Sequence, residues 1–561
     1  MKKLSALPRR ARSLNELLVI TGKELTMNQM KMRIIALFLS LCLVLTGCNL
    51  LERTGLKDLM DQIQMDAYTV SYSDMEYVRP DPTAIQTALD ACIESADAED
   101  FSVLEEALYA YMDLYYDFYT NYSLADIRYC CDLTDIYWTD EYNYCMEQSP
   151  EISAGIDQLM YVLADSPHRE ILETDEYYGE DYFDDYEGES IWDETFTALM
   201  EEEADLISEY YDLSAQLVDS TDTDSIYIRM ADLLAELIAL RQDIAAYVGY
   251  ESFHPFAYDF YYARDYSPEQ EAAYLQQVKQ ELVPLYDQIA YTTMSDLQTD
   301  YSSAVDTFAY VREMANAMGG TVKDAFHLLD TAGLYDITYS DNKYNASFEV
   351  YLYSYGEPFI FMNPSGTTND HLTFAHEFGH FCNDYASYGS MAGVDIAEIF
   401  SQGMEYLSLF YCEDTEMLTK IKMVDSLCVF VEQSAYAEFE RRAYGLEGDA
   451  LTGEKLITLF GDVAMEYGFG DLGDNKIFFT QITHFYTNPM YVFSYVVSND
   501  AAMQLYQLEC AEAGAGLAAL EANLGTTEVS FLAFLQSAEL ESPFADDRVK
   551  SIRATFEDIL K

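Results

Sequence analysis

Residues 370–380 have the sequence DHLTFAHEFGH, and this stretch determines how the rest of the chain is interpreted. It places His376 and His380 four residues apart. On an α-helix, positions i and i+4 lie on one face, about one turn apart. Two imidazoles on one face can bind a single Zn²⁺ ion, which in a catalytic site takes one further protein ligand and keeps one position open. The stretch therefore predicts a helix that carries two ligands of one zinc ion per chain.

Glu377 gives the same stretch a candidate catalytic group. In a His-Glu-x-x-His helix, the carboxylate after the first histidine acts as general base toward a water molecule. The helix is supported by Asn369 and Asp370, which are good N-cap residues, and by the absence of proline from residues 370–388. The alternative is a helix that carries two histidines by chance. Three of the chain's seven histidines lie at positions 371, 376 and 380, which favours the metal site.

A second helix, predicted over residues 394–411, offers the third ligand. Four of its polar residues follow the spacing i, i+3, i+4 and i+7, which places them on one face: Glu398, Ser401, Gln402 and Glu405. By spacing alone, either glutamate could complete a site of two histidines and one carboxylate. The other glutamate would then accept a hydrogen bond from a ligand histidine and orient it. A solvated acidic stripe is the alternative, and the apolar residues on the same helix argue against it.

The segment before the zinc helix is predicted to be a β-hairpin. Residues 347–355 (SFEVYLYSY) alternate in the way that suits a strand, and residues 359–362 form a second short apolar run. The residues Gly356, Glu357 and Pro358 between them are typical of a turn. A strand at the edge of such a hairpin, beside a metal, could pair with the extended backbone of a peptide.

Residues 482–495 (ITHFYTNPMYVFSY) combine one histidine with three tyrosines. The side chains of His484, Tyr491 and Tyr495 carry N–H and O–H donors that could stabilise the oxyanion of a tetrahedral intermediate. An aromatic core segment with no chemical role is the other interpretation of the same residues.

The composition of the 561-residue chain restricts the class of protein. Half of the residues are hydrophobic, which excludes a chain that is disordered throughout, and the length suits one large core or two to three domains. The formal net charge is −69, so the chain lacks the basic surface that nucleic-acid binding requires. An acidic surface favours solubility and attracts cations and basic ligands over long range. A generally acidic surface with no role in substrate steering is the alternative.

The N-terminal segment is typical of an exported protein. Lys31 and Arg33 precede an apolar run over residues 34–45, which is too short for a confident membrane span and is followed by small residues. The sequence Leu-Thr-Gly-Cys at 45–48 resembles the bacterial lipobox, which implies that Cys48 becomes the lipidated first residue of the mature protein. An ordinary signal peptide or an uncleaved anchor is the alternative.

These features predict a signal peptide over residues 1–47 and a lipid anchor on the outer face of a bacterial cell membrane. Translation could begin at one of the methionines just before the apolar run, Met27, Met30 or Met32. An exported protein could oxidise some of the eight cysteines beyond Cys48, although buried free thiols are at least as consistent with their spacing.

Beyond a tether predicted over residues 48–59, the first half of the chain is predicted to be helical. Apolar residues recur every three to four positions in segments such as 101–119 and 226–247. The run 173–190 (ETDEYYGEDYFDDYEGES) interrupts this pattern and is typical of a solvated acidic loop, with cation binding as the alternative. Further helical stretches are predicted near residues 268–318, 500–513 and 544–559.

Four segments, in this order along the chain, resemble the thimet oligopeptidase/oligoendopeptidase F family of zinc peptidases, and most closely its bacterial oligoendopeptidase F branch. They are VGYES at 248–252 with ARDY at 263–266, the strand, loop and helix over 358–380, AEIFSQGME at 397–405, and HFYTNPMYVFSY at 484–495. The resemblance covers residues 246–510 well and the preceding part only in its helical character. The FCND sequence after His380, the acidic run and the lipobox depart from the family pattern.

The resemblance implies a mainly α-helical fold with a deep substrate cleft and a small β-hairpin or sheet beside the zinc helix. It implies a helical N-terminal region over residues 60–245 and a catalytic domain over residues 246–561. By the match to the family's motifs, Glu398 is the third zinc ligand, supported by Glu405 and Ser401. The same match implies that His484, Tyr491 and Tyr495 contact the substrate and the transition state.

The predicted function is hydrolysis of internal bonds in short oligopeptides, with zinc on two histidines and a glutamate and with Glu377 as general base. One alternative is a surface lipoprotein that captures peptides with a non-catalytic zinc site, which would not need Glu377. The other is a metallocarboxypeptidase, which would need a cationic group for the terminal carboxylate of its substrate. The motif segments contain few lysines or arginines that could supply it.

Overall fold

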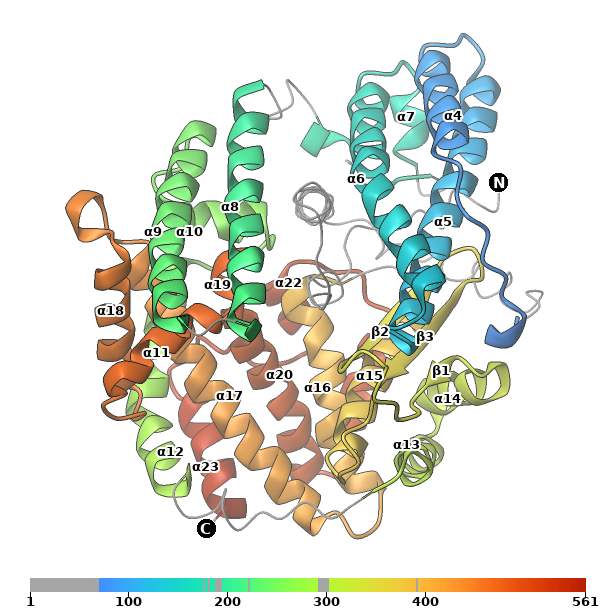
Figure 1. Ribbon diagram of the computed structural model, residues 1–561. Coiled ribbons are helices and arrows are strands. Elements are labelled where there is room, and N and C mark those ends of the chain that lie inside the picture. Colours follow the sequence, from blue (N-terminus) through green and yellow to red (C-terminus); the bar gives the residue numbers. More distant parts are fainter. Residues whose placement is uncertain are drawn as a thin grey trace.

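The computed structural model describes residues 70–560, except 175–176, 180–181, 187–193, 220–221, 291–301 and 390–391. The predicted signal peptide over residues 1–47, the lipidation site Cys48 and the tether over 48–59 lie outside the described residues. The fold is built almost entirely of helices, with one small sheet (Figure 1), which confirms the predicted fold class. The deep substrate cleft stays a prediction.

The first helices form a group with a hydrophobic core of its own. Three of them begin at an aspartate whose side chain accepts a backbone N–H of the first turn, as N-cap residues do: Asp81, Asp100 and Asp135. The group stands together beside the sheet in Figure 1, and its helices are α4 (Pro82–Ser95), α5 (Phe101–Cys131), α6 (Ile136–Ala164) and α7 (Arg169–Leu172).

The described part of the acidic run 173–190 is not a solvated loop, and that prediction is wrong for its aromatic residues. Tyr178, Phe183 and Tyr186 are buried in the core of the α4–α7 group. Arg169 pairs with Glu173 and Asp184 on the outside of the same segment. The acidic residues therefore lie around an aromatic anchor that the charge pattern does not reveal.

The next helices belong to the larger hydrophobic core, and those over residues 194–290 line the side of the molecule opposite the α4–α7 group in Figure 1. Two long helices, α8 (Glu194–Asp219) and α9 (Thr223–Val248), pack against each other. Shorter helices follow: α10 (Phe253–Phe260), α11 (Pro268–Glu281), α12 (Val283–Ala290), α13 (Ala304–Met318) and α14 (Gly320–Ala332).

The sheet has three strands in the order β1-β3-β2. Strands β2 (Ser347–Leu352) and β3 (Glu357–Met362) form the predicted antiparallel hairpin, with Leu352 opposite Glu357 across a tight turn. Gly356 in this turn has φ +69°, which glycine adopts without strain. Strand β1 (Tyr335–Asp336) pairs parallel with β3 and was not predicted, because two residues carry no alternating pattern. Strand β2 therefore forms one edge of the sheet.

Four helices form the centre of the larger core: α15 (Asp370–Ser387), α16 (Val394–Tyr411), α17 (Glu416–Ala443) and α20 (Val492–Ala511). Helix α16 packs on α15 and α20, and both strands of the hairpin pack on α15. The predicted bounds of α16 are confirmed. Asn369 precedes α15 but makes no cap hydrogen bond, and Asp370 instead accepts the backbone N–H groups of Ser365 and Gly366 in the preceding loop.

The remaining elements complete the packing around this centre. They are α18 (Gly453–Glu466), α19 (His484–Thr487), α21 (Ala515–Asn523), α22 (Phe531–Ser537), α23 (Arg548–Leu560) and the 3₁₀ segments Tyr72–Asp74, Asp184–Tyr186, Gly448–Ala450 and Gly473–Gln481. The eight cysteines between Cys92 and Cys510 are free thiols. Across the described ranges, none of the helices has the length and apolar character that a membrane crossing needs.

Candidate metal centre

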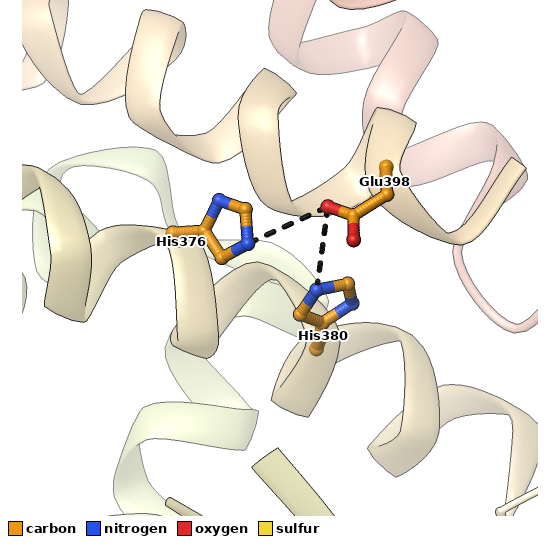
Figure 2. Close-up of side chains that lie close together, drawn as sticks. All are labelled: His376, His380 and Glu398. Carbon is orange, nitrogen blue, oxygen red and sulfur yellow. Dashed lines mark ion pairs between the residues drawn. The ribbon is translucent and has the colours of Figure 1, made fainter. Parts of the chain in front are cut away.

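The two histidines of α15 and Glu398 of α16 converge on one point, as Figure 2 shows. One carboxylate oxygen of Glu398, Oε2, lies 3.5 Å from Nε2 of His376 and 3.7 Å from Nε2 of His380. The two imidazole rings are nearly perpendicular, with centroids 5.1 Å apart. Three side chains that are separated by up to 22 positions in sequence thus present one ligand atom each to a common space.

This donor set fits a zinc ion. Its three ligand atoms all lie within 4.8 Å of one another, and Zn²⁺ bonds of about 2.0–2.2 Å to nitrogen and oxygen span such separations. Two neutral nitrogens and one carboxylate leave a fourth position open, as catalytic zinc sites do. Within the part of the chain that the structure describes, no other group of three or more His, Cys, Asp or Glu side chains has this geometry.

The helix crossing that brings Glu398 to the histidines depends on Gly379. A Cβ atom at this position would lie 2.5 Å from the carbonyl oxygen of Phe400 and 2.6 Å from the Cα of Ser401. Only a residue without a side chain allows the two backbones to approach so closely. The glycine between the two histidines therefore sets the distance between the helix that carries them and the helix that carries Glu398.

Glu405 lies behind the site and orients His376. Its Oε1 accepts a hydrogen bond from Nδ1 of His376 at 2.8 Å, which leaves Nε2 directed toward Glu398. On the other side of the site, the hydroxyl of Ser401 donates to Oε2 of Glu398 at 2.9 Å. Of the two arrangements that spacing allowed, the structure thus places Glu398 between the histidines and Glu405 in the supporting position.

Lys422 of α17 is a neighbour that the sequence did not indicate. Its Nζ lies 2.9 Å from Oε2 of Glu405, and both side chains are buried. Burial alone would raise the pKa of Glu405, but the Lys422 charge and the His376 hydrogen bond lower it below its usual value. A lysine that faces inward on a long helix could have been noticed as a candidate partner for a buried acid. Nothing in the sequence says which acid it meets.

Glu377 lies beside the same space and is shielded from water. Burial, which is the main cause, raises the pKa of its carboxyl group to about 7, and the neighbouring His376 and Ser347 oppose this shift. Ser347 is the first residue of β2 and hydrogen-bonds the Glu377 carboxylate, which was not predicted. The start of the edge strand thus lies at the candidate general base.

The carboxylates give the centre a negative field. Burial would lower the pKa of His376, but its hydrogen bond with Glu405 and the charges of Glu398 and Glu405 raise that pKa to about 9. At His380, burial outweighs the charges of Glu398 and Glu405 and lowers the pKa to about 4. A cation between the two rings would be stabilised by this field and would take the place of the proton on His376.

The three predicted donors of the C-terminal segment lie together. Tyr495 Oη is 3.4 Å from Nε2 of His484, and the ring of Tyr491 stacks on that of His484 with centroids 5.4 Å apart. Tyr491 is buried, and its pKa is raised well above 10 by burial first and then by the charges of neighbours that include Glu398. The segment therefore lies within electrostatic range of the carboxylate of Glu398.

The backbone before Tyr491 is anchored from three sides. Met490 has φ +66°, which is rare for a residue with a side chain. Its N–H donates to Oε1 of Glu440 at 2.9 Å, and its carbonyl accepts from Arg264 at 3.0 Å. The hydroxyl of Tyr262 donates to the carbonyl of Pro489 at 2.7 Å. These contacts fix the turn that presents Tyr491, and they give Arg264 of the ARDY segment a structural role.

Comparison with known proteins agrees with the geometry. Residues 72–190 match the model of the Peptidase M3 N-terminal domain. A stretch of 173 residues is 32% identical to oligopeptidase PepF of Bacillus subtilis (strain 168), which covers 27% of this chain and 25% of that protein. The alignment with this curated relative thus spans about a quarter of the relative's length.

Solved structures match over a much larger part of the chain. A protein assigned as an oligoendopeptidase F superposes with a TM-score of 0.72 at 22% identity, covering 88% of this chain and 98% of its own. PZ peptidase A with an inhibitor gives 0.69 at 20% identity, with coverages of 87% and 98%. A protein of Bacillus anthracis str. Ames that is likewise assigned as an oligoendopeptidase F gives 0.68 at 20% identity, with coverages of 88% and 98%. The fold is that of oligoendopeptidase F, and the predicted resemblance is confirmed.

Proposed function

We propose that this protein is a zinc-dependent endopeptidase that hydrolyses internal bonds of short oligopeptides. The observation that carries the proposal is the convergence of His376, His380 and Glu398 with the buried carboxylate of Glu377 beside them. Three ligands alone would serve a structural site equally well. A carboxylate that is shielded from water and lies beside the ligands, without being one of them, is what a general base toward a metal-bound water requires.

When bound by the two histidines and Glu398, Zn²⁺ would polarise the scissile carbonyl group and lower the pKa of a water molecule to about 7. Glu377 accepts the proton of the attacking water and delivers it to the nitrogen of the leaving amine. The hydrogen bond from Ser347 keeps the Glu377 carboxylate in one orientation during this transfer. Glu405 holds the ring of His376 through its Nδ1.

His484 and Tyr491 can donate hydrogen bonds to the negative charge that develops on the carbonyl oxygen of the scissile bond. Burial lowers the pKa of His484 to about 4, so its ring is neutral at pH 7 and one nitrogen carries a hydrogen to donate. The raised pKa of Tyr491 keeps its hydroxyl protonated, so the hydroxyl retains a hydrogen to donate. Both groups can therefore donate to the oxyanion of a tetrahedral intermediate.

The substrate class follows from the strand beside the base. Strand β2 forms one edge of the sheet, and its first residue touches Glu377. A peptide that pairs with this edge would lie extended across the zinc ligands, with its backbone and not its termini as the recognised feature. Among the described residues, Lys422 beside Glu405 and Arg264 behind the turn at Met490 are paired with Glu405 and Asp395, so neither suits the terminal carboxylate that a carboxypeptidase binds.

The test is product analysis on a peptide with both ends blocked. An endopeptidase cleaves an internal bond and releases two fragments, each of which keeps one blocked end. A carboxypeptidase would cleave only the same peptide with a free C-terminus. A protein that captures peptides would bind the blocked peptide and leave it intact. Either of the last two outcomes would replace the endopeptidase proposal.

We also propose that the mature protein is held at the outer face of a bacterial membrane through a lipid on Cys48. The support is the apolar run over 34–45 followed by Leu-Thr-Gly-Cys. Because a single acyl chain binds a membrane only marginally, stable anchoring needs the diacyl modification of bacterial lipoproteins. Fractionation of cells that express wild type or Cys48→Ala tests this, and a wild-type protein found wholly in the cytosol would refute it.

A further inference from the structure

We infer that Lys422 is a positioning residue of the metal centre, which acts through Glu405 to hold His376 in the orientation that binds the ion. The inference rests on the proposed zinc site and adds to it a residue from a third helix. The contacts run from Lys422 on α17 through Glu405 on α16 to Nδ1 of His376 on α15, and we call these three residues the relay.

The contacts of the relay are short and each oxygen of Glu405 has one partner. Nζ of Lys422 lies 2.9 Å from Oε2, and Nδ1 of His376 lies 2.8 Å from Oε1. A carboxylate that is held at both oxygens cannot rotate without breaking one of the two contacts. The plane of the carboxylate, and with it the direction in which His376 points, is therefore set from the side of α17.

Lys422 is itself fixed in place. It is 3% exposed, and its ammonium lies 4.5 Å from the centroid of the Tyr406 ring, which attracts a cation through its π face. The hydroxyl of Tyr406 donates to Ser426 Oγ at 2.6 Å, and it is 2.9 Å from Asn499 Oδ1. The charge of the lysine is thus held by a ring that is anchored to α17 and α20, and the ammonium has little freedom to leave Glu405.

The physical role follows from the burial of Glu405. A buried carboxylate without a counter-ion is strongly unfavourable, and it turns toward water or toward another donor if the structure allows. Without Lys422, Oε2 of Glu405 would lose its partner, and Oε1 would no longer be fixed relative to Nδ1 of His376. The imidazole would then sample orientations and tautomers in which Nε2 does not face the ion. Loss of such an orienting partner typically weakens metal binding about 10–100-fold.

The helix that carries Lys422 offers a matched control. Lys420 lies two residues away on the same helix; its side chain is 41% exposed and pairs with the exposed Glu416. Lys420→Met changes the same charge by the same substitution without touching the centre. We expect this variant to bind zinc with the wild-type dissociation constant, within about twofold.

The experiment measures the zinc dissociation constant by competition with a chromogenic chelator, on apoprotein whose circular dichroism matches that of wild type. We expect Lys422→Met to bind zinc about 10–100-fold more weakly than wild type and Lys420→Met. Equal affinity of Lys422→Met and wild type overturns the inference. Absence of zinc binding by wild type overturns the proposed metal site instead, so the two failures are distinguishable.

A double substitution separates the relay from a general loss of structure. If Lys422 acts only through Glu405, its removal has no further effect once Glu405→Gln has removed the carboxylate charge. We expect Glu405→Gln alone to weaken zinc binding and the double variant Glu405→Gln/Lys422→Met to match it within about twofold, because residues in one network are not additive. A further loss of about tenfold or more in the double variant overturns the relay. This comparison also holds if Lys422→Met alone does not fold.

Discussion

Gly379 of α15 lies directly against the backbone of Ser401 in α16, so that a Cβ atom on Gly379 would stand 2.6 Å from the Cα of Ser401. This contact joins the helix of the two histidines to the helix of Glu398. It explains why a glycine stands in the interior of a helix, where it would otherwise weaken the fold. The spacing of the three candidate metal ligands is thus a consequence of how closely two backbones approach.

Gly379→Ala should destabilise the protein by about 1–3 kcal/mol, because the added methyl group overlaps backbone that cannot move without separating the helices. The free energy of unfolding in urea measures this. Gly461→Ala in α18 is the matched control, since the nearest atom to its Cβ belongs to the flexible side chain of Lys476, at 3.3 Å. The control should be neutral or slightly stabilising. Equal stability of Gly379→Ala and wild type would contradict the contact.

The ligand assignment predicts how zinc content responds to substitution. His376→Ala, His380→Ala and Glu398→Ala should each abolish tight binding of about one zinc per chain, because each removes one of three protein ligands. Glu405→Ala should bind zinc more weakly but still measurably, since it removes only the partner of His376. Metal analysis after dialysis measures the content. Full zinc in Glu398→Ala together with loss in Glu405→Ala would show that the two glutamates have been assigned the wrong way round.

Sequence reasoning identified the two helices of the site because their patterns are local. The spacing of His376 and His380 and the spacing of Glu398 and Glu405 are each properties of one helix, and α16 was predicted with its observed bounds. The hairpin was also predicted from its alternation, although its first strand ends at Leu352 and not at Tyr355. In each case the period of the pattern determined the element.

The features that sequence reasoning missed depend on contacts between distant segments. Lys422 meets Glu405 because α17 packs beside α16, and no residue pattern on α17 indicates that neighbour. Ser347 reaches Glu377 for the same kind of reason. Spacing along one helix left Glu398 and Glu405 open as the third ligand, and only the resemblance to the family pointed to Glu398, which the structure places beside the two histidines.

The buried carboxyl group of Glu440 should make the stability of the protein depend on pH, and this effect is separate from the candidate metal centre. Burial raises the pKa of its carboxyl group to about 8, well above the usual 4.5. Between these values the folded state binds a proton that the unfolded state has released, so stability falls as the pH rises through this window. Gln has no proton to lose and retains an oxygen that can accept the N–H of Met490.

Glu440→Gln should therefore become more stable than wild type as the pH rises from 5 to 8, by on the order of 2–4 kcal/mol, since one unit of pKa shift corresponds to about 1.4 kcal/mol. Urea unfolding of both proteins at pH 5, 6.5 and 8.5 measures the difference, in which all other titrating groups cancel. A stability difference that does not change with pH would show that Glu440 titrates at its ordinary pKa.

The donors near Glu398 should affect turnover and not binding. In the proposed mechanism, His484→Ala and Tyr491→Phe each remove one hydrogen bond that would form to the oxyanion only in the transition state. We expect kcat to fall by roughly 10²–10³ for each, with little change in KM and unchanged zinc content. Steady-state kinetics on a short peptide measures both constants. A rise in KM at constant kcat would place these residues in ground-state binding of the peptide instead.

The most direct test of the proposed chemistry is turnover by Glu377→Gln of an internally quenched peptide, short and blocked at both ends, with zinc content measured on the same sample. Glutamine keeps the shape of Glu377 and removes the basic carboxylate, and Glu377 is no metal ligand. The account predicts wild-type zinc content, retained peptide binding, and turnover reduced by roughly 10²–10⁴ or more. Cleavage by Glu377→Gln at the wild-type rate would contradict the proposed mechanism.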